Sequence, residues 1–213
     1  MVRFKNIIFD LDGTLIDSSP DIIQSLVSAY LKESISNINF TRYHIGPKLD
    51  AVIDILTPNI DSDIKSKVIA NFRSIYDHLE EKKTVLYNSV FESLEKLKEQ
   101  KHSLFIATNK PQSATIPLLK YFKIDTYFTD VLTPTSVKGK NLNKTQMVSY
   151  IIDTYHLDKN QSVMVGDHQD DIAAAKNNGI ASVAVLYGYS HQDALRQSQP
   201  DYEINSFSEF LTL

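Results

Sequence analysis

Two aspartates at the end of a short apolar run are the residues of this chain best suited to chemistry. The segment Ile7–Thr14 reads IIFDLDGT, so Asp10 and Asp12 directly follow the apolar run, and Gly13 comes next. Such a run indicates a buried strand of a parallel sheet, and open α/β sheets bind ligands at the carboxyl ends of their strands. Two neighbouring carboxylates repel each other unless a cation lies between them. The segment therefore predicts a metal-assisted site with one carboxylate free to act as a nucleophile, or else an ordinary Asp-Gly turn.

Polar residues also follow two later strand-like runs. The run LFIA leads into Thr108 and Asn109, a hydroxyl and an amide that suit either a phosphate oxygen or the N-cap of the next helix. The run VMV leads through a glycine into Asp167, and Asp171 follows four residues later at a helix start. The Asp167 carboxylate could reach a cation held by Asp10. Hard oxygen ligands favour Mg²⁺ over a transition metal.

A lysine-rich loop offers a positive charge to this site. It contains Lys138, Lys140 and Lys144. Asn143 has the character of an N-cap, which places Lys144 in the first turn of the next helix and fixes it better than a lysine within the loop. Such a lysine would neutralise the nucleophile and the phosphoryl group. We expect Lys144 to face the acidic pair, with Lys138 and Lys140 as the alternatives.

Strand-like and helix-like patterns alternate over most of the chain, which predicts a parallel sheet with helices on both faces. After the first strand, we expect strands at 103–108, 131–132, 162–165, 181–186 and 202–204, and helices at 90–100, 145–156 and 170–178. These elements would bring the polar residues that follow the strands to one edge of the sheet.

One segment, residues 18–83, breaks this alternation and contains no convincing strand. Helical patterns begin at Ser19, where Pro20 follows, and cover 49–56 and 61–80. Helices inserted here would lie over the carboxyl end of the first strand, where they can exclude water and contact a substrate. The alternative is that they simply pack on the sheet.

The composition excludes several classes of protein. The 213 residues contain no cysteine, which excludes disulfides, zinc-thiolate sites and cysteine nucleophiles. The net charge of −4 gives no support to nucleic-acid binding, and no apolar segment approaches the length of a membrane span. The first apolar run meets Asp10 too soon for a signal peptide. We expect a cytoplasmic monomer or homodimer whose partner is a small molecule.

Four groups of residues resemble, in order, the four motifs of the haloacid dehalogenase-like hydrolase superfamily: the segment Asp10–Thr14, Thr108 with Asn109, Lys144, and Asp167 with Asp171. The resemblance covers nearly the whole chain and is to the phosphoglycolate phosphatase-like branch, which has a helical cap of the C1 type. It implies an α/β fold. A Rossmann-like doubly wound parallel sheet would form the catalytic core, residues 1–16 and 84–213, and a small all-α cap domain, residues 17–83, would be inserted after the first strand.

The resemblance implies a role for each catalytic residue. Asp10 would be the nucleophile that forms an aspartyl-phosphate, and Asp12 the general acid that protonates the leaving group and then the base that activates water. Lys144 would complete the catalytic set, and Thr108 and Asn109 would bind the phosphoryl oxygens. Dehalogenases and the phosphonatase branch lack the aspartate at the position of Asp12, so its presence favours a phosphatase or a phosphomutase.

The resemblance also implies Mg²⁺ as the cofactor. Its ligands would be Asp10, Asp167 and the backbone carbonyl of Asp12, while Asp171 would orient a water on the metal or the active-site lysine. Gly13 would let the chain turn sharply after the strand.

The expected function is Mg²⁺-dependent hydrolysis of a small-molecule phosphomonoester, similar to that of phosphoglycolate phosphatases. The alternatives are a phosphomutase of the β-phosphoglucomutase type, a nucleotide phosphatase and a non-catalytic binding protein. Phosphoglycolate, a nucleoside monophosphate, pyrophosphate and a sugar phosphate all remain open as substrates. Specificity should lie in the loops 17–21 and 41–48.

Five further polar residues could face the site. Within the insertion, four residues either contact the substrate or lie at the surface: Arg42, Tyr43, His44 and Lys48. His168, beside the last acidic motif, either reaches the mouth of the site or points to solvent, and we expect it to point to solvent.

Overall fold

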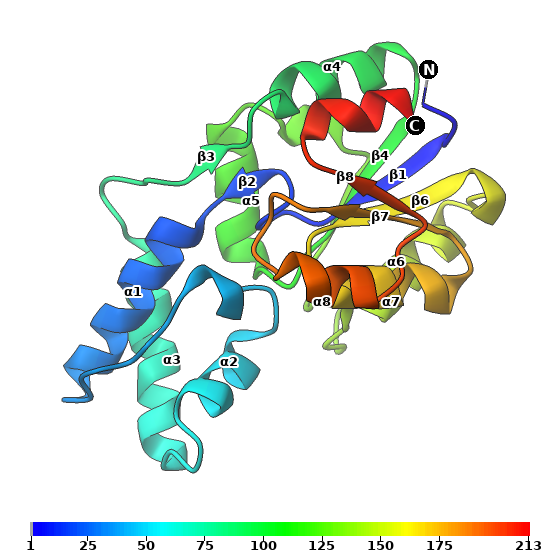
Figure 1. Ribbon diagram of the computed structural model, residues 1–213. Helices are drawn as coiled ribbons and strands as arrows, with labels where there is room; N and C mark the ends of the chain where they lie inside the picture. The colour runs from blue at the N-terminus through cyan, green and yellow to red at the C-terminus, as the bar shows by residue number, and fades with distance from the viewer. Residues whose placement is uncertain (1) are drawn as a thin grey trace.

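A six-stranded parallel sheet forms the centre of the molecule, as Figure 1 shows for the computed structural model, which describes residues 2–213. The strand order is β5-β4-β1-β6-β7-β8, and every neighbouring pair is parallel. The strands are β1 (Asn6–Phe9), β4 (Ser103–Ala107), β5 (Asp130–Leu132), β6 (Ser162–Gly166), β7 (Ala181–Val185) and β8 (Tyr202–Ile204). The prediction of an α/β fold with a doubly wound sheet is confirmed.

Helices cover both faces of this sheet because its strands are apolar on both sides. The helices of the core are α4 (Val90–Glu99), α5 (Gln112–Tyr121), α6 (Lys144–Thr154), α7 (Gln169–Asn178), α8 (Gln192–Gln197) and the 3₁₀ helices η2 (Asp125–Tyr127), η3 (Lys159–Gln161) and η4 (Phe207–Thr212). In β1, Ile7 and Phe9 pack in the cluster that includes α4, α5 and η4, whereas Ile8 packs in the cluster that includes α6 and α7. Because successive side chains of a strand point to opposite faces of the sheet, the sheet has a separate hydrophobic core on each face.

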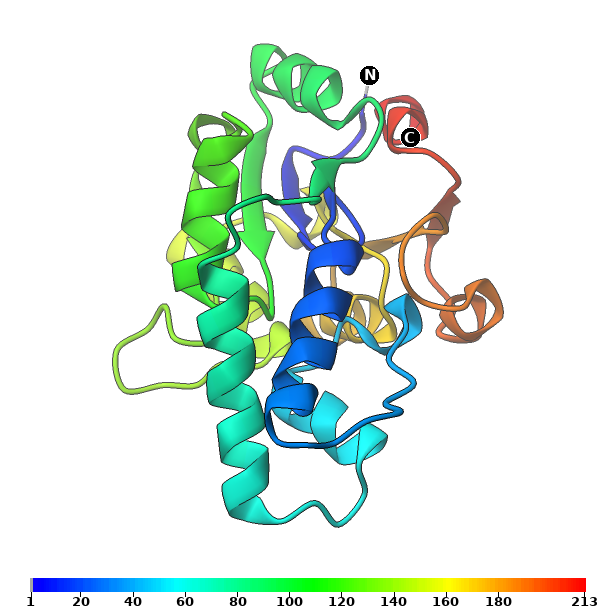
Figure 2. The ribbon, with the colours of Figure 1, turned by 90° about the vertical axis from the view of Figure 1, so that its left-hand side faces the viewer.

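Three of the four α-helices between β1 and β4 form a separate group beside the sheet (Figures 1 and 2). They are α1 (Ser19–Lys32), α2 (Leu49–Leu56) and α3 (Ser62–Asp77), with the 3₁₀ helix η1 (Arg42–His44) before α2. We call residues 19–77 the helical segment. Its helices have a hydrophobic cluster of their own, in which Tyr189 of the core is also buried. In Figure 2, α1 and α3 run side by side.

The two chain crossings between the sheet and the helical segment lie next to each other. Strands β2 (Ile16–Asp17) and β3 (Val85–Leu86) pair antiparallel at this place. Asp21, in the first turn of α1, accepts hydrogen bonds from the backbone N–H and the hydroxyl of Thr84 at 2.9 and 2.6 Å. The division into a core and a cap domain at residues 17 and 83 stays a prediction, and these contacts lie at both proposed boundaries.

Several elements of the structure are missing from the sequence analysis, and one helix ends earlier than expected. The pattern analysis does not identify α5, whose interior contains Pro117, a residue that weakens a helix because it lacks an N–H donor. It also omits α8 and the two-residue strands β2 and β3, which are too short to show a period. Helix α3 ends at Asp77, three residues before the expected end. Within residues 2–213, no helix is both long and apolar enough to cross a bilayer.

Candidate active site

The predicted site residues lie where the strand order reverses. β1 is flanked by β4 on one side and β6 on the other. Asp10 follows β1, Thr108 follows β4 and Asp167 closely follows the end of β6. Because open sheets bind ligands at such a switch point, the topology itself selects this edge as the candidate site.

Three buried carboxylates meet at this edge. One oxygen each from Asp10, Asp167 and Asp171 lies within 4.8 Å of the others. Burial raises the pKa of Asp10, and Asp171 raises it further, although Lys144 acts in the opposite direction. Burial also raises the pKa of Asp167 well above its usual value, with Asp10 and Asp171 adding to the effect. Three acids held together in this way would be stabilised by a bound cation.

The donor set fits a hard divalent cation. All three groups offer carboxylate oxygens, the ligands that Mg²⁺ prefers. The Asp167 carboxylate is fixed by the N–H of Tyr189 at 2.6 Å and by the hydroxyl of Thr14 at 3.3 Å. It also packs so closely on Gly13, whose φ is +84°, that a Cβ there would lie 2.2 Å from its Oδ2. Gly13 therefore leaves room for Asp167 besides allowing the turn.

Lys144 is the lysine that reaches the acidic cluster. Its Nζ lies 2.7 Å from Oδ1 of Asp10 and 2.9 Å from Oδ1 of Asp171, and it donates to the carbonyl oxygen of Ala107 at 2.9 Å. Burial alone would lower the pKa of Lys144, but the two carboxylates more than offset this and raise it. Asn143 caps the helix as the pattern predicts, since its side chain accepts from the N–H of residue 146.

The alternative lysines lie away from the acidic cluster, and the polar residues after β4 make contacts of their own. Lys138 and Lys140 are exposed. The buried hydroxyl of Thr108 accepts from the N–H of Lys110 at 3.1 Å. Asn109 donates its side-chain N–H to the carbonyl oxygen of Gly46, 2.9 Å away in the helical segment. In this arrangement Asn109 joins the core to the helical segment.

The Asp12 side chain turns away from the other acids. Its Oδ1 accepts from the hydroxyl of Ser18 at 2.5 Å and from Nζ of Lys110 at 3.0 Å. The side chains of Asp10, Asp167 and Asp171 form the cluster without it. This separation leaves Asp12 as an independent carboxylate beside the cluster.

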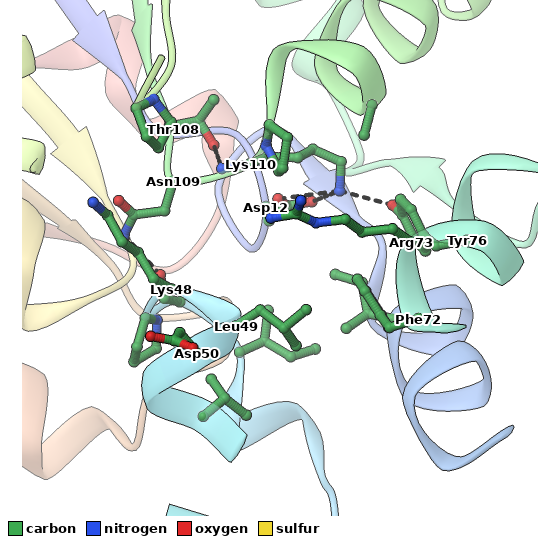
Figure 3. A pocket seen from close by; sticks show the side chains of 18 of the residues that line it. Asp12, Lys48, Leu49, Asp50, Phe72, Arg73, Tyr76, Thr108, Asn109 and Lys110 are labelled. Atoms are coloured by element: carbon green, nitrogen blue, oxygen red, sulfur yellow. Dashed lines mark hydrogen bonds and ion pairs between the residues drawn. The ribbon is translucent and has the colours of Figure 1, made fainter. Parts of the chain in front are cut away.

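A cavity of about 540 Å³ lies between the end of the sheet and the helical segment (Figure 3). Asp10, Asp12, Thr108 and Asn109 line its floor, and side chains of α2 and α3 line its walls, among them Leu49, Val52, Ile69, Phe72, Arg73 and Tyr76. An entering molecule would meet carboxylates at one end and a largely apolar wall with a few charges at the other.

The expectation that His168 points to solvent is wrong. Its ring is about one-fifth exposed, and its Nδ1 accepts from the N–H of Asp170 at the start of α7. The ring lies against Gly46, where a Cβ would be 2.9 Å from the ring carbon Cδ2. The helical segment covers His168, and pattern analysis could not foresee this contact between residues so distant in sequence.

The polar residues predicted in the helical segment divide into two pairs. Arg42 donates to the carbonyl oxygen of Gly188 at 2.9 Å, and the ring of Tyr43 stacks on that of His191 with centroids 3.8 Å apart. These two hold the segment against the core. His44 and Lys48 line the cavity, and Lys48 also donates to Asn141 at 2.9 Å.

The loop 17–21, also expected to set specificity, does not line this cavity. Asp17 accepts from the hydroxyl of Ser19 at 2.6 Å, and Asp21 bonds to Thr84. Both carboxylates therefore accept hydrogen bonds at the place where the chain passes between the sheet and the helical segment.

Comparison with known proteins settles the family. The sequence model of the haloacid dehalogenase-like hydrolases matches residues 7–185. The chain belongs to this family.

The resemblance to phosphoglycolate phosphatases is also confirmed. This haloacid dehalogenase-like hydrolase is 30% identical to a phosphoglycolate phosphatase of Vibrio vulnificus, over 98% of this chain and 95% of the other. It is 28% identical to a 5'-nucleotidase of Pseudomonas aeruginosa, over 94% and 91% of the two chains. The crystal structure of a predicted phosphoglycolate phosphatase from Haemophilus somnus matches with a TM-score of 0.85 and 31% identity, over 100% of this chain and 98% of that one.

Two residues of this hydrolase's site escaped the sequence analysis. Lys110 contacts Asp12, and Tyr76 of α3 contacts Lys110. The only sequence signal for Lys110 was its place directly after Thr108 and Asn109 at a strand end, and Tyr76 carried no signal beyond its place in the helix predicted at 61–80.

Proposed function

We propose that this chain hydrolyses a small-molecule phosphomonoester with Mg²⁺ and through a phosphorylated Asp10. That it is a phosphoric monoester hydrolase follows from the relatives described above. The observation that carries the mechanism is the position of Asp10. Its carboxylate lines the cavity, pairs with Lys144 at 2.7 Å and shares a metal-sized cluster with Asp167 and Asp171.

In the first step, a carboxylate oxygen of Asp10 attacks phosphorus and the bond between phosphorus and the ester oxygen breaks. Asp12, in its acid form, gives a proton to the departing oxygen, so that an alcohol leaves. Lys144 holds the other oxygen of Asp10, and its charge offsets the negative charge that gathers as the phosphoryl group approaches.

In the second step, water attacks phosphorus of the aspartyl-phosphate and inorganic phosphate leaves. Asp12 now takes the proton from that water, which restores its acid form and the free Asp10 carboxylate. The helical segment would act as a cap that keeps other water from the cavity. The contacts of Asn109 with Gly46 and of Lys48 with Asn141 hold this cap in place.

The cation would be held by Asp10, Asp167 and the backbone carbonyl of Asp12. When bound, Mg²⁺ supplies positive charge that offsets the repulsion between the nucleophile and the phosphoryl group. Asp171 would keep Lys144 in position, because its Oδ1 pairs with that ammonium and its Oδ2 accepts from the N–H of His168 at 3.0 Å.

Two substrates deserve to be tested first. Phosphoglycolate is the substrate named for the relative from Vibrio vulnificus, and a nucleoside monophosphate corresponds to the 5'-nucleotidase from Pseudomonas aeruginosa. A cavity of about 540 Å³ with an apolar wall favours the nucleotide as the second candidate, since it could enclose a base and a ribose.

The first experiment measures phosphate release from both substrates, a sugar phosphate and pyrophosphate, with Mg²⁺ and with a chelator. We expect turnover that needs Mg²⁺ and is lost in Asp10→Ala. Asp170→Asn, which changes an exposed acid on the same edge, should retain it. Turnover that survives in Asp10→Ala would overturn the proposal, and sugar-phosphate isomerisation without phosphate release would replace it by a phosphomutase.

A further inference from the structure

A buried lysine outside the acidic cluster has no part in the mechanism so far. Lys110 follows β4 and is 7% exposed. Its ammonium donates to Oδ1 and Oδ2 of Asp12 at 3.0 and 3.3 Å, and to the hydroxyl oxygen of Tyr76 at 2.7 Å (Figure 3). Burial alone lowers the pKa of Lys110, but Asp12 and Tyr76 more than offset it, so the ammonium stays charged.

The second partner of this lysine comes from the helical segment. Tyr76 lies in the last turn of α3 and is buried. The ring of Tyr76 stacks on that of Phe72, with centroids 5.5 Å apart. Nζ of Lys110 lies 4.6 Å from the centre of the Tyr76 ring. Burial raises the pKa of Tyr76, so the phenol keeps its proton. The neutral hydroxyl can therefore accept a hydrogen bond from the Lys110 ammonium, while Asp12 alone supplies the negative charge that pairs with it.

Asp12 is held from two sides, by Ser18 and by Lys110. Ser18, whose hydroxyl binds Oδ1 of Asp12, directly precedes α1. Lys110 belongs to the core, but its long side chain is fixed at its end by Tyr76 of α3. If the Tyr76 hydroxyl were missing, the flexible lysine stem would lose one of its two anchors. The Asp12 carboxylate would then be held less firmly.

We propose that Tyr76 is a positioning residue that fixes Lys110 and, through it, the carboxylate of Asp12 in the orientation needed for proton transfer to the leaving group. This inference rests on the proposed function, in which Asp12 is the acid. It means that α3 does more than cover the cavity, because its packing on the core completes the support of the proton donor. A loss of orientation at a general acid weakens the step that needs the proton and leaves binding largely intact.

The test uses Tyr76→Phe, which removes one oxygen and keeps the ring. The matched control is Tyr30→Phe, because Tyr30 is also a buried tyrosine of the helical segment but bonds to Thr57 at 3.0 Å and not to Lys110. For each variant, kcat/KM is measured with an alkyl phosphate, whose leaving group needs a proton, and with p-nitrophenyl phosphate, whose leaving group does not. The constant kcat/KM reports the steps up to departure of the leaving group. Comparing its value for the two substrates therefore isolates the need for a proton.

We expect Tyr76→Phe to lower kcat/KM for the alkyl phosphate by roughly tenfold to hundredfold, within the range of general-acid effects, and for p-nitrophenyl phosphate by less than about threefold. Tyr30→Phe should affect both substrates equally. Equal losses for Tyr76→Phe on the two substrates, or a ratio like that of Tyr30→Phe, would overturn the inference.

Lys110→Met gives an independent measurement if Tyr76→Phe folds poorly. It should show the same selective loss, and the double variant should lose little beyond Lys110→Met, because both changes break one chain of contacts. Additive losses would count against the inference. Asp10→Ala in the same assay separates the two claims. If Asp10→Ala is inactive and Tyr76→Phe has the same ratio of kcat/KM between the two substrates as the wild type, only this inference fails. Activity in Asp10→Ala would instead overturn the proposed function on which the inference rests.

Discussion

At the scale of single residues, the four carboxylates of the site differ in their partners. Lys144 pairs with Asp10 and Asp171, and Lys110 pairs with Asp12. Asp167 is held by neutral donors instead. Asp10 and Asp12, the proposed nucleophile and the proposed acid, therefore pair with different lysines. This arrangement keeps the two carboxylates of the segment Asp10-Leu11-Asp12 in different surroundings, as their different proposed roles require.

The ion pairs of Lys144 lead to a prediction for both activity and stability. Lys144→Met should lower kcat by at least about hundredfold, because the positive charge beside Asp10 is lost. It should also lower the free energy of unfolding in chelator by about 3–5 kcal/mol, since two buried carboxylates lose their partner. Phosphate release and urea unfolding measure the two effects. Lys140→Met, which removes an exposed lysine of the same loop, should leave both nearly unchanged; equal behaviour of the two variants would contradict the prediction.

At the scale of elements, the strands could be predicted from sequence far better than the contacts between helices and sheet. β1, β4 and β6 are apolar runs that stop at a polar residue, so both their position and the residues at their ends were readable. The bond between Lys110 and Tyr76 was not readable. It depends on the angle at which α3 packs on the core, and the hydrophobic periodicity of the sequence does not determine that angle.

The exposed arginine of α3 offers a prediction at this scale. Arg73 extends from α3 into the cavity, and within residues 2–213 it forms no hydrogen bond or ion pair (Figure 3). A guanidinium suits a carboxylate on the substrate. Arg73→Met should therefore raise KM for phosphoglycolate by about tenfold and leave KM for ethyl phosphate nearly unchanged, since a charged hydrogen bond contributes about 1.5–3 kcal/mol.

Steady-state kinetics on the two substrates test this role of Arg73. Lys67→Met is the control, because Lys67 is an exposed cation of the same helix that does not line the cavity. A similar rise in KM for both substrates, or for both variants, would mean that Arg73 acts only through the overall charge of α3.

At the scale of the whole molecule, the helical segment and the sheet are joined by contacts spread around the cavity. Arg42 binds Gly188, Lys48 binds Asn141 and Tyr76 binds Lys110. The acidic cluster belongs to the core, where Asp10 and Asp167 follow strands and Asp171 lies in α7. The side chains proposed to hold the cation therefore all belong to the core, whereas the proposed support of Asp12 also involves Tyr76 of α3.

This division predicts how the metal affects stability. Mg²⁺ at about 100 times its Kd should raise the free energy of unfolding by about 2.7 kcal/mol, equivalent to roughly 5–10 °C in Tm for a chain of this length. The increase should disappear in Asp167→Asn, which removes a charged ligand.

In chelator, Asp167→Asn should unfold at the same temperature as the wild type or higher, because one of three buried like charges is gone. Thermal unfolding with Mg²⁺ and with chelator measures both effects, and Asp170→Asn should respond to Mg²⁺ like the wild type, since its exposed carboxylate is not among the cluster's ligands. A full Mg²⁺ response in Asp167→Asn would place the metal elsewhere. A Tyr76→Phe protein with the full response would show that cation binding is independent of the contact that α3 makes with Lys110.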